Sequence, residues 1–533
     1  MSTSKKIVAK KQVDAELPER RLSLWRVMLG IVLLAGLVLG SMYGMRAWNA
    51  AQATGDLKPW FASYVDVTST PTFAFEELGG SPNRSVVLSF IVSKSSDACV
   101  PTWGGAYTLD EASAALDLDR RIARLQQQDG SVAVSFGGLK NDELAVRCKD
   151  VANLTTAYEA VIDRYDLNMI DLDLENNGLT NKEAGERRAK AVAELQTKRR
   201  VSGKDLAVWV TLPVAPQGMT EDGTNAVKQL LDGGVDLAGV NVMTMNYGSS
   251  RGNGESMQRA SERALMETHR QLGVLYKQAG ISLNSATLWS KIGATPMIGQ
   301  NDVAKEVFTL GDAKGLNAFS RSKGIGRMSM WSANRDVPCG DNYVDTSIVS
   351  DSCSGVDDEP RSFAQALSEG FEGDLKLNAS IITTEDTDAA EQKVDDPKSS
   401  PYPIWQETGA YLQGTKVVWR HNVYEAKWWT QGDIPDNPVL QSWETPWRLI
   451  GPVLPGEKPV QQATLPEGTY PEWSGKKEYE TSSRVLFEGV PYQAKWWNMG
   501  DSPAAASSNP DSSPWVPLTQ AQIEEINKDP ASQ

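Results

Sequence analysis

The fold of this chain is constrained most by an alternation of apolar and helical segments between residues 59 and 374. Some apolar segments are almost continuous, as at residues 86–88 (Val-Val-Leu), which is typical of strands covered on both faces in a parallel sheet. Helical patterns lie between them, for example Leu118, Ile122 and Leu125, which recur with the spacing of one helix face. We predict eight strands, at residues 61–67, 85–92, 131–136, 168–175, 206–214, 239–247, 287–298 and 327–332. Eight strand and helix units over about 300 residues indicate an α/β protein with a (β/α)8 TIM barrel.

The fourth predicted strand carries three carboxylates that alternate with leucines. Its sequence, Asn-Met-Ile-Asp-Leu-Asp-Leu-Glu-Asn, fills residues 168–176. Because side chains alternate along a strand, Asp171, Asp173 and Glu175 share one face and the leucines share the other. We therefore expect one face to pack in a core and the acidic face to form a site.

Three acids on one face cannot all be ionised cheaply where water is scarce, so they must share protons. Glu175 lies nearest the solvent end, where the carboxyl ends of barrel strands form the active site. Its pKa is expected to be raised, which suits a general acid near neutral pH. The alternatives are an exposed edge strand with solvated acids, or a calcium site. The leucines on the other face argue against an exposed strand.

The acidic composition limits the classes of partner and of chemistry. A net charge of −15 argues against nucleic acid as a partner, because phosphates attract basic surfaces. The two histidines, His269 and His421, lie outside any metal-ligand spacing, which leaves little material for histidine or zinc chemistry. We expect carboxylates to carry the reaction, with no cofactor and no metal, on a neutral substrate.

The N-terminal region predicts a membrane anchor. Residues 1–26 hold seven Lys or Arg against three acids, and residues 27–45 form an uncharged, mostly apolar run of 19 residues. That length spans a bilayer, and the basic segment before it predicts a single pass through the cell membrane with the N-terminus in the cytoplasm and the catalytic region outside. The alternative is secretion after signal cleavage, since residues 51–53 (Ala-Gln-Ala) offer a cleavage site.

The four cysteines make an even number, which is compatible with a disulfide framework outside the cell. We predict the pairs Cys99–Cys148 and Cys339–Cys353, because this connectivity closes the shortest loops of the three that are possible. The alternative is four free thiols.

Polar and aromatic residues follow the carboxyl ends of other predicted strands and are expected to converge with Glu175 on one cavity. The residues expected to contact substrate are Ser135, Gly137, Gly138, Met243, Asn246, Tyr247 and Trp331. No second acid at another strand end stands out as an opposing partner, because the position after Met245 is Asn246.

This one-sided arrangement of acids predicts an unusual route for glycoside cleavage. Common glycosidases place two carboxylates on opposite sides of the bond, about 5–9.5 Å apart. Here a 2-acetamido group of the sugar can supply the nucleophile, with Glu175 as general acid and base and Asp173 stabilising the cyclic oxazolinium ion. This mechanism implies a polymer of N-acetylglucosamine as substrate, with Trp331 beneath the reacting sugar.

The region after the barrel contains a linker and an internal repeat. Residues 375–400 lack aromatic residues and are rich in polar ones, as in a solvated linker. Residues 401–453 and 469–518 then share the motif Tyr-x-Ala-Lys-Trp-Trp-x-x-Gly-Asp-x-Pro at an offset of 68 residues. Each unit is too small for a deep core and is expected to be all-β. Neighbouring residues of a strand face opposite ways, so at most one tryptophan of each pair is expected in the core. The expected sugar-binding platform comprises Tyr424, Trp428, Trp429, Tyr492, Trp496 and Trp497, and the alternative is that these residues are only structural.

Four motifs in order resemble a bacterial family 18 glycoside hydrolase, a chitinase, over residues 59–374. They are Asp-Leu-Asp-Leu-Glu at 171–175, Ser-x-Gly-Gly at 135–138, Met-Thr-Met-Asn-Tyr at 243–247 and Met-Trp-Ser-Ala-Asn-Arg-Asp at 330–336. The resemblance implies that Asp171, Asp173 and Glu175 are the catalytic acids. The repeat resembles the chitin-binding modules of carbohydrate-binding families 5 and 12. Two positions depart from the pattern, since the family has an acid where this chain has Asn168 and Asn246, and the second departure implies a changed pH profile and reduced turnover.

The resulting hypothesis is a membrane-anchored, monomeric chitinase that acts on chitin or chito-oligosaccharides with retention of configuration. One alternative is a non-catalytic chitin-binding lectin or adhesin on an inactive barrel. The other alternative is an endo-N-acetylglucosaminidase, which shares the chemistry but gains little from two polysaccharide-binding repeats.

Overall fold

The structure is a computed structural model of the chain. It describes residues 58–78, 84–303, 305–340, 348–375, 394–454, 456–457, 465–508 and 511–528. No helix within these ranges is long and apolar enough to cross a membrane. The predicted span at 27–45 and the basic segment at 1–26 lie outside the described residues, as does most of the predicted linker.

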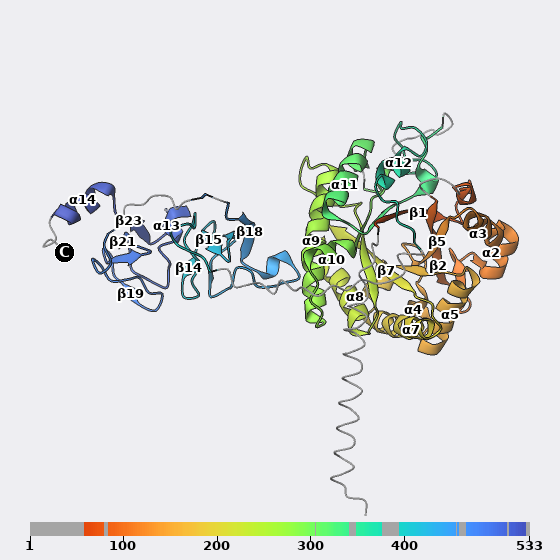
Figure 1. The fold of residues 1–533 in the computed structure, drawn as a ribbon, viewed down its shortest axis with the longest axis horizontal. Coiled ribbons are helices and arrows are strands. Elements are labelled where there is room, and N and C mark those ends of the chain that lie inside the picture. The colour runs from red at the N-terminus through yellow and green to blue at the C-terminus, as the bar shows by residue number, and fades with distance from the viewer. Residues whose placement is uncertain are drawn as a thin grey trace, which may run out of the picture. The chain divides into compact units, whose positions relative to one another are not determined.

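Eight parallel strands close into a barrel (Figure 1), as the alternation of segments predicts. Going round the barrel, the strands are β1 (Trp60–Asp66), β13 (Arg327–Met330), β10 (Ile292–Thr295), β9 (Leu237–Met243), β7 (Ala207–Ala215), β6 (Met169–Asp173), β5 (Ser131–Gly137) and β2 (Ser85–Ser93). Parallel pairing of β1 with both β2 and β13 closes the ring. Shorter strands extend the loops: β3 (Pro101–Trp103), β4 (Tyr107–Thr108), β8 (Gly218–Met219), β11 (Gly299–Gln300) and β12 (Val307–Phe308).

Helices surround the strands (Figure 1). They are α2 (Leu109–Leu116), α3 (Leu118–Gln127), α4 (Leu144–Arg147), α5 (Val151–Arg164), α6 (Asn176–Thr180), α7 (Lys182–Val201), α8 (Glu221–Asp232), α9 (Met257–Gln278), α10 (Ser285–Ser290), α11 (Leu310–Lys323) and α12 (Ser362–Ser368). Helices such as α7 and α9 begin after a residue, Asn181 or Ser256, whose side chain accepts a hydrogen bond from the first turn.

The strand predicted at 287–298 is shorter than expected, because residues 287–290 are helical. Asn284 accepts a hydrogen bond from the backbone N–H of Thr287 and so starts α10, and β10 begins only at Ile292. The N-cap at Asn284 therefore outweighs the strand preference of the apolar residues that follow it.

Two hydrophobic clusters divide the residues of the barrel strands between its two faces. Ile170 and Leu172 of β6 belong to the cluster between strands and helices. Met169 joins the second cluster with Trp60 and Trp209, whose rings meet edge to face 5.6 Å apart. The alternation that this register imposes on β6 turns Asp171 and Asp173 to the same side as Met169, which is the barrel interior.

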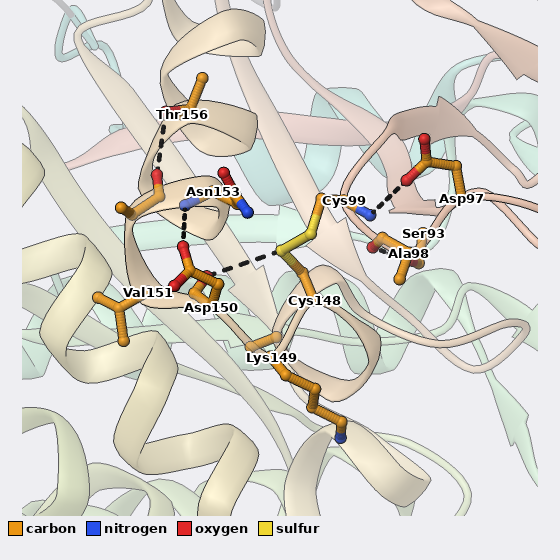
Figure 2. Close-up of a disulfide and its surroundings, with 12 residues drawn as sticks. Ser93, Asp97, Ala98, Cys99, Cys148, Lys149, Asp150, Val151, Asn153 and Thr156 are labelled. Carbon is orange, nitrogen blue, oxygen red and sulfur yellow. Dashed lines mark hydrogen bonds between the residues drawn. A yellow bond between two sulfur atoms is a disulfide. The ribbon is translucent and has the colours of Figure 1, made fainter.

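Both predicted disulfides are present. Cys99–Cys148 joins the loop between β2 and β3 to the segment that leads into α5 (Figure 2). Next to it, Asp150 caps α5 by accepting a hydrogen bond from the N–H of Asn153. Cys339–Cys353 closes a loop between β13 and α12. Covalent closure of these loops constrains the unfolded chain and so stabilises the barrel.

The repeated region forms two small all-β units with matching elements. The first contains β14 (Ala410–Tyr411), β15 (Lys416–Trp419), β16 (Asn422–Ala426), β17 (Thr430–Gln431) and β18 (Trp447–Pro452). The second contains β19 (Glu478–Tyr479), β20 (Arg484–Phe487), β21 (Val490–Ala494), β22 (Asn498–Met499) and β23 (Trp515–Pro517). The helix α13 (Ala505–Ser508) lies between β22 and β23, and α14 (Gln520–Lys528) follows β23. In each unit three strands form one antiparallel sheet and two form another. The sequence repeat is therefore a structural repeat.

The tryptophan pairs of the two units are more exposed than strand alternation predicts. Trp428 and Trp429 are 44% and 55% exposed, and Trp496 and Trp497 are 45% and 53% exposed. Each pair lies in the bend between two strands, β16 and β17 or β21 and β22, so alternation does not apply to it. Neither member of a pair is in the core.

Two tyrosines that were expected on the same platforms are instead structural. Tyr424 and Tyr492 are 8% and 2% exposed and belong to the shared hydrophobic core of the repeated region. They lie inside β16 and β21, where alternation does apply and turns them inward.

Candidate active site

A cleft of about 500 Å³ opens at the carboxyl ends of the barrel strands. Strand β6 ends at Asp173, and Glu175 follows in extended conformation, immediately before α6. Both carboxyls line the cleft. The side chains that line it also include Tyr64, Asp66, Phe90, Lys140, Met243, Asn246, Asp302, Trp331 and Asp351.

Asp171 lies beneath the cleft and holds the interior of the barrel together. It is 1% exposed and accepts four hydrogen bonds. The donors are Tyr64 Oη at 2.8 Å, Ser135 Oγ at 2.7 Å, Thr211 Oγ1 at 2.7 Å and Arg327 Nη1 at 2.7 Å. These donors come from four strands besides β6, so Asp171 fixes the register of the barrel interior below the reacting groups.

Asp173 is buried one step above Asp171. Burial raises the pKa of Asp173 well above its usual range, and the negative charges of Glu175 and Asp171 raise it further, whereas Arg327 lowers it. Its Oδ1 atom is buried and has no hydrogen-bond partner among the described residues. A buried polar atom without a partner is costly, which suits an atom that binds a group of the substrate.

Glu175 is the acid at the mouth of the cleft. Burial raises the pKa of Glu175 to about 7, with the negative charge of Asp302 as the second cause. A carboxyl with such a pKa is protonated in part of the molecules at neutral pH. It can therefore donate a proton and take it back.

Aromatic rings form one wall of the cleft. Trp331 stacks on Phe90 with centroids 5.5 Å apart and planes at 21°, and Tyr64 lies 6.1 Å from Trp331. Planar apolar faces of this kind suit the apolar face of a sugar ring.

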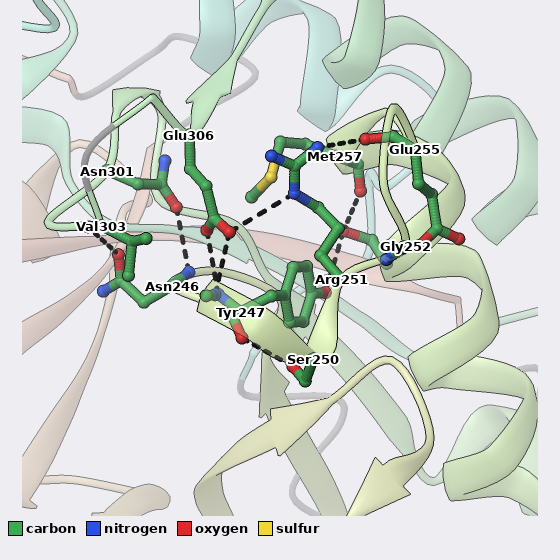
Figure 3. A network of polar contacts seen from close by, with 12 residues as sticks. Asn246, Tyr247, Ser250, Arg251, Gly252, Glu255, Met257, Asn301, Val303 and Glu306 are labelled. Atoms are coloured by element: carbon green, nitrogen blue, oxygen red, sulfur yellow. Dashed lines mark hydrogen bonds and ion pairs between the residues drawn. The ribbon is translucent and has the colours of Figure 1, made fainter.

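Asn246 also lines the cleft, in a left-handed conformation with φ of 53°. Its backbone N–H donates to Asn301 Oδ1 at 3.2 Å, and its Oδ1 accepts from the N–H of Val303 at 3.3 Å (Figure 3). Its Nδ2 donates to Asp302 Oδ2 at 2.8 Å. The buried Glu306 accepts from the next two backbone N–H groups and holds this loop from below.

Four residues expected to contact substrate lie behind the cleft instead of lining it. Ser135 is fully buried and donates to Asp171, and the Tyr247 ring is buried with its hydroxyl 3.2 Å from Ser261 Oγ. Gly137 and Gly138 allow close approach: a Cβ on Gly137 would lie 2.1 Å from the carbonyl oxygen of Asp173. Ser135 lies inside β5 and its side chain turns into the barrel interior toward Asp171, below the cleft, whereas the two glycines carry no side chain that could reach into it.

Several cleft residues were not predicted to contact substrate, among them Asp302, Phe90 and Tyr64. Asp302 lies in the hairpin turn between β11 and β12, well past the end of β10. Only the run of Gly299, Gln300 and Asn301 before it marks a turn, and a turn signal does not predict direction. Tyr64 and Phe90 are in apolar strand segments, where an aromatic ring facing the barrel interior looks like any core residue.

Comparisons with known proteins find relatives for about half of this chain. No protein-family model matches the chain. A probable bifunctional chitinase/lysozyme of Escherichia coli is 35% identical over 289 residues, which make up 53% of this chain and 31% of that protein. Endochitinase 11 of Metarhizium anisopliae is 34% identical over 285 residues, 52% of each chain. The chain thus spans between about a third and a half of the length of these relatives.

Among solved structures, the catalytic domain of a hyperthermophilic chitinase from Pyrococcus furiosus aligns with 60% of this chain and 97% of its own, at 26% identity and a TM-score of 0.50. Catalytic-site mutants of the same protein align equally well. These similarities support assignment of the barrel to the glycoside hydrolases and a general likeness to chitinases.

Proposed function

We propose that this protein is a family 18 chitinase, which hydrolyses β-1,4 bonds between N-acetylglucosamine units and retains the anomeric configuration. The observation that carries the proposal is the pair formed by Glu175, with its raised pKa, and Asp173, with its unpartnered oxygen, in one aromatic-walled cleft. Relatives named chitinases support the substrate class. A structure of the Pyrococcus furiosus domain complexed with chito-oligosaccharides supports it further.

In the proposed first step, Glu175 gives its proton to the glycosidic oxygen, and the bond from that oxygen to C1 breaks. The carbonyl oxygen of the sugar's own acetamido group forms a new bond to C1 and makes a cyclic oxazolinium ion. Asp173 Oδ1 accepts a hydrogen bond from the acetamido N–H and stabilises the positive charge.

In the second step, the ionised Glu175 takes a proton from a water molecule, whose oxygen attacks C1 and opens the ring. Two displacements at C1 retain its configuration. The ring of Trp331 supports the distorted sugar, and Asp171, buried below Asp173, contributes its negative charge to the raised pKa of Asp173 without lining the cleft.

We assign chitin binding to the two repeated units. Each presents two half-exposed tryptophans next to each other, and in each a lysine lies 4.6 Å above the ring of the first tryptophan, Lys427 over Trp428 and Lys495 over Trp496. Such rigid aromatic pairs suit a flat row of sugar rings. Together with a membrane anchor at 27–45, or secretion by cleavage near 51–53, they would keep the barrel at an insoluble surface and raise its effective concentration there.

The lectin alternative predicts binding of chitin without products. Two features argue against it: the acid with a pKa near 7, and the desolvated Asp173 beside it, since a binding site has no need for either.

The test is incubation of the full chain with chitohexaose, followed by mass spectrometry of the products. We expect shorter chito-oligosaccharides from the wild type, and their rate of formation should fall by at least 10³-fold with Glu175→Gln, as for loss of a general acid. Lack of any product from the wild type, or full activity of the variant, would overturn the proposal.

A further inference from the structure

The strand end at Asn246 carries no charge, yet an acid reaches the same place from another loop. Asp302 lies in the turn of the hairpin formed by β11 and β12, and it lines the cleft that also contains Glu175. The side-chain amide of Asn246 donates to Asp302 Oδ2 at 2.8 Å. The amide therefore fixes the direction of a carboxylate that belongs to a different segment of the chain.

The turn that carries Asp302 is held at several points. Asn301 is 2% exposed, donates to the carbonyl oxygens of Met297 and Gly299 at 2.9 and 3.2 Å, and accepts from the Asn246 N–H. On the other side of Asp302, the N–H of Val303 donates to Asn246 Oδ1 at 3.3 Å (Figure 3). Asn246 thus contacts three successive residues of the turn, which leaves Asp302 little freedom although its side chain is solvent-exposed.

The second anchor of this arrangement is Glu306. It is 3% exposed, accepts from the N–H groups of Tyr247 and Gly248 at 2.9 Å each, and pairs with Arg251 at 3.4 Å (Figure 3). Glu306 follows the same turn in sequence, so the two segments are tied together on both sides of Asp302. Contacts on both sides thus hold the carboxylate of Asp302 in a fixed position, as is needed for its charge to act on a neighbouring group at a fixed distance.

We propose that Asp302 is a further carboxylate of the active site and a positioning residue for the acid: Asn246 holds its charge in the cleft that contains Glu175, in place of an acid that the strand end itself lacks. This inference rests on the proposed function and names a further residue of the same site. In this role Asp302 keeps the proton on Glu175 up to neutral pH. Its influence should grow when a sugar chain fills the cleft and excludes water.

Other charged groups around Glu175 do not take this role. Within the described residues, the titratable groups that line the cleft besides Asp302 are Tyr64, Asp66, Lys140, Asp173 and Asp351, and Asp171 and Arg327 lie beneath it. Asp173 is buried beside Glu175, and the charge of Glu175 raises its pKa, whereas Asp302 is the exposed acid whose negative charge joins burial in raising the pKa of Glu175. Asp351, on the loop closed by the second disulfide, offers a matched control because its removal takes the same charge from the same cleft.

The first experiment measures the dependence of kcat/KM on pH for chitohexaose. With Asp302→Asn we expect the alkaline limb to move to lower pH by about half a unit or more, because Glu175 loses its proton more easily. At pH 7 kcat should fall more than KM rises. Asp351→Asn should leave the alkaline limb within about 0.2 units of the wild type. An unchanged limb in Asp302→Asn, or an equal shift in both variants, would overturn the inference.

Exchange of the acid and the amide between positions 246 and 302 distinguishes the proposed role of Asp302 from a structural one. Asn246→Asp alone puts two carboxylates within hydrogen-bond distance of each other and should not raise kcat. The double variant Asn246→Asp with Asp302→Asn restores one charge and one amide, and we expect its alkaline limb to return toward the wild-type position. If Asn246→Asp alone raises kcat, the site works better with an acid at position 246 itself, and the inference is wrong.

The last measurement does not depend on activity. The carboxyl carbons of glutamate, labelled with 13C, are followed by NMR in the full chain, and Glu175→Gln identifies the signal of Glu175. Its pKa should be lower in Asp302→Asn than in the wild type, and an equal pKa would contradict the inference. If the wild type cleaves no chito-oligosaccharide but this shift is observed, the proposed function fails and the inference about Asp302 stands.

Discussion

Replacing Asp171 by asparagine tests how the barrel interior supports the site. Asp171 and Arg327 are 1% and 0% exposed, and their ion pair is 2.7 Å long. Asparagine has almost the same size, but it removes the charge and replaces one acceptor oxygen by a donor. Tyr64 and Thr211 can turn their hydroxyl groups, whereas the guanidinium of Arg327 has only donors to offer.

The size of the effect follows from the burial of the partner. Removal of one member of a buried ion pair leaves the other charge uncompensated and costs about 3–5 kcal/mol. A domain of a few hundred residues loses about 2–4 °C of Tm per kcal/mol, so we expect the barrel to melt about 10 °C lower. Because the charge of Asp171 is one cause of the raised pKa of Asp173, the variant should also lower that pKa.

Thermal unfolding of the full chain at pH 7, followed by circular dichroism and repeated as urea titration, measures this loss. Asp232→Asn is a suitable control, since Asp232 also pairs with a cation, Lys228, but the two side chains are 56% and 49% exposed. An exposed pair contributes about 0–1 kcal/mol, so the control should melt within about 3 °C of the wild type. If Asp171→Asn melts at the same temperature as the control, loss of the Asp171 charge does not cost the expected stability of about 3–5 kcal/mol.

Two further predictions concern the acid and the binding units. The pKa of Glu175 rises from 4.5 to about 7 on folding, so ionisation of Glu175 destabilises the fold as the pH rises between these two values. Glu175→Gln should therefore be more stable than the wild type at pH 8, by at most about 3 kcal/mol. At pH 4.5 the two proteins should differ little in stability. If the difference in Tm between Glu175→Gln and the wild type does not depend on pH, this prediction is wrong. The double variant Trp429→Ala with Trp497→Ala should bind insoluble chitin about tenfold more weakly and still cleave chitohexaose. Trp443 is an exposed tryptophan of the first unit that has no counterpart in the second, and Trp443→Ala should bind normally. Equal losses in the two variants would refute the assignment of the platforms.

Much of the barrel could be predicted from the sequence, because its signals are local and periodic. Apolar runs mark the strands, and the alternation in residues 168–175 correctly separates Asp171 and Asp173 from the residues that pack on the helices. The cysteine pairs were predictable for a similar reason, since short loops between them left few choices. The exception at 287–298 arose where Asn284 starts a helix within an apolar segment.

The site could be predicted only in part, because its geometry depends on contacts between distant loops. No pattern in the sequence shows that Asn246 would hold an acid from residue 302, since turn direction and side-chain pairing are tertiary properties. Aromatic residues of one motif also differ in burial. Tyr424 lies inside a strand and packs in the core, whereas Trp428 lies in a bend and is half exposed. Function-bearing positions outside regular elements are thus the hardest to predict.

The most direct test of the central claim asks whether the substrate's own acetamido group is needed. Chitohexaose and its fully deacetylated counterpart are incubated with the wild type, and 1H NMR records the anomer that forms first. The account predicts a β-anomer from chitohexaose and no cleavage of the glucosamine hexamer. An α-anomer as the first product, or comparable cleavage of both hexamers, would contradict the mechanism built on Glu175 and Asp173.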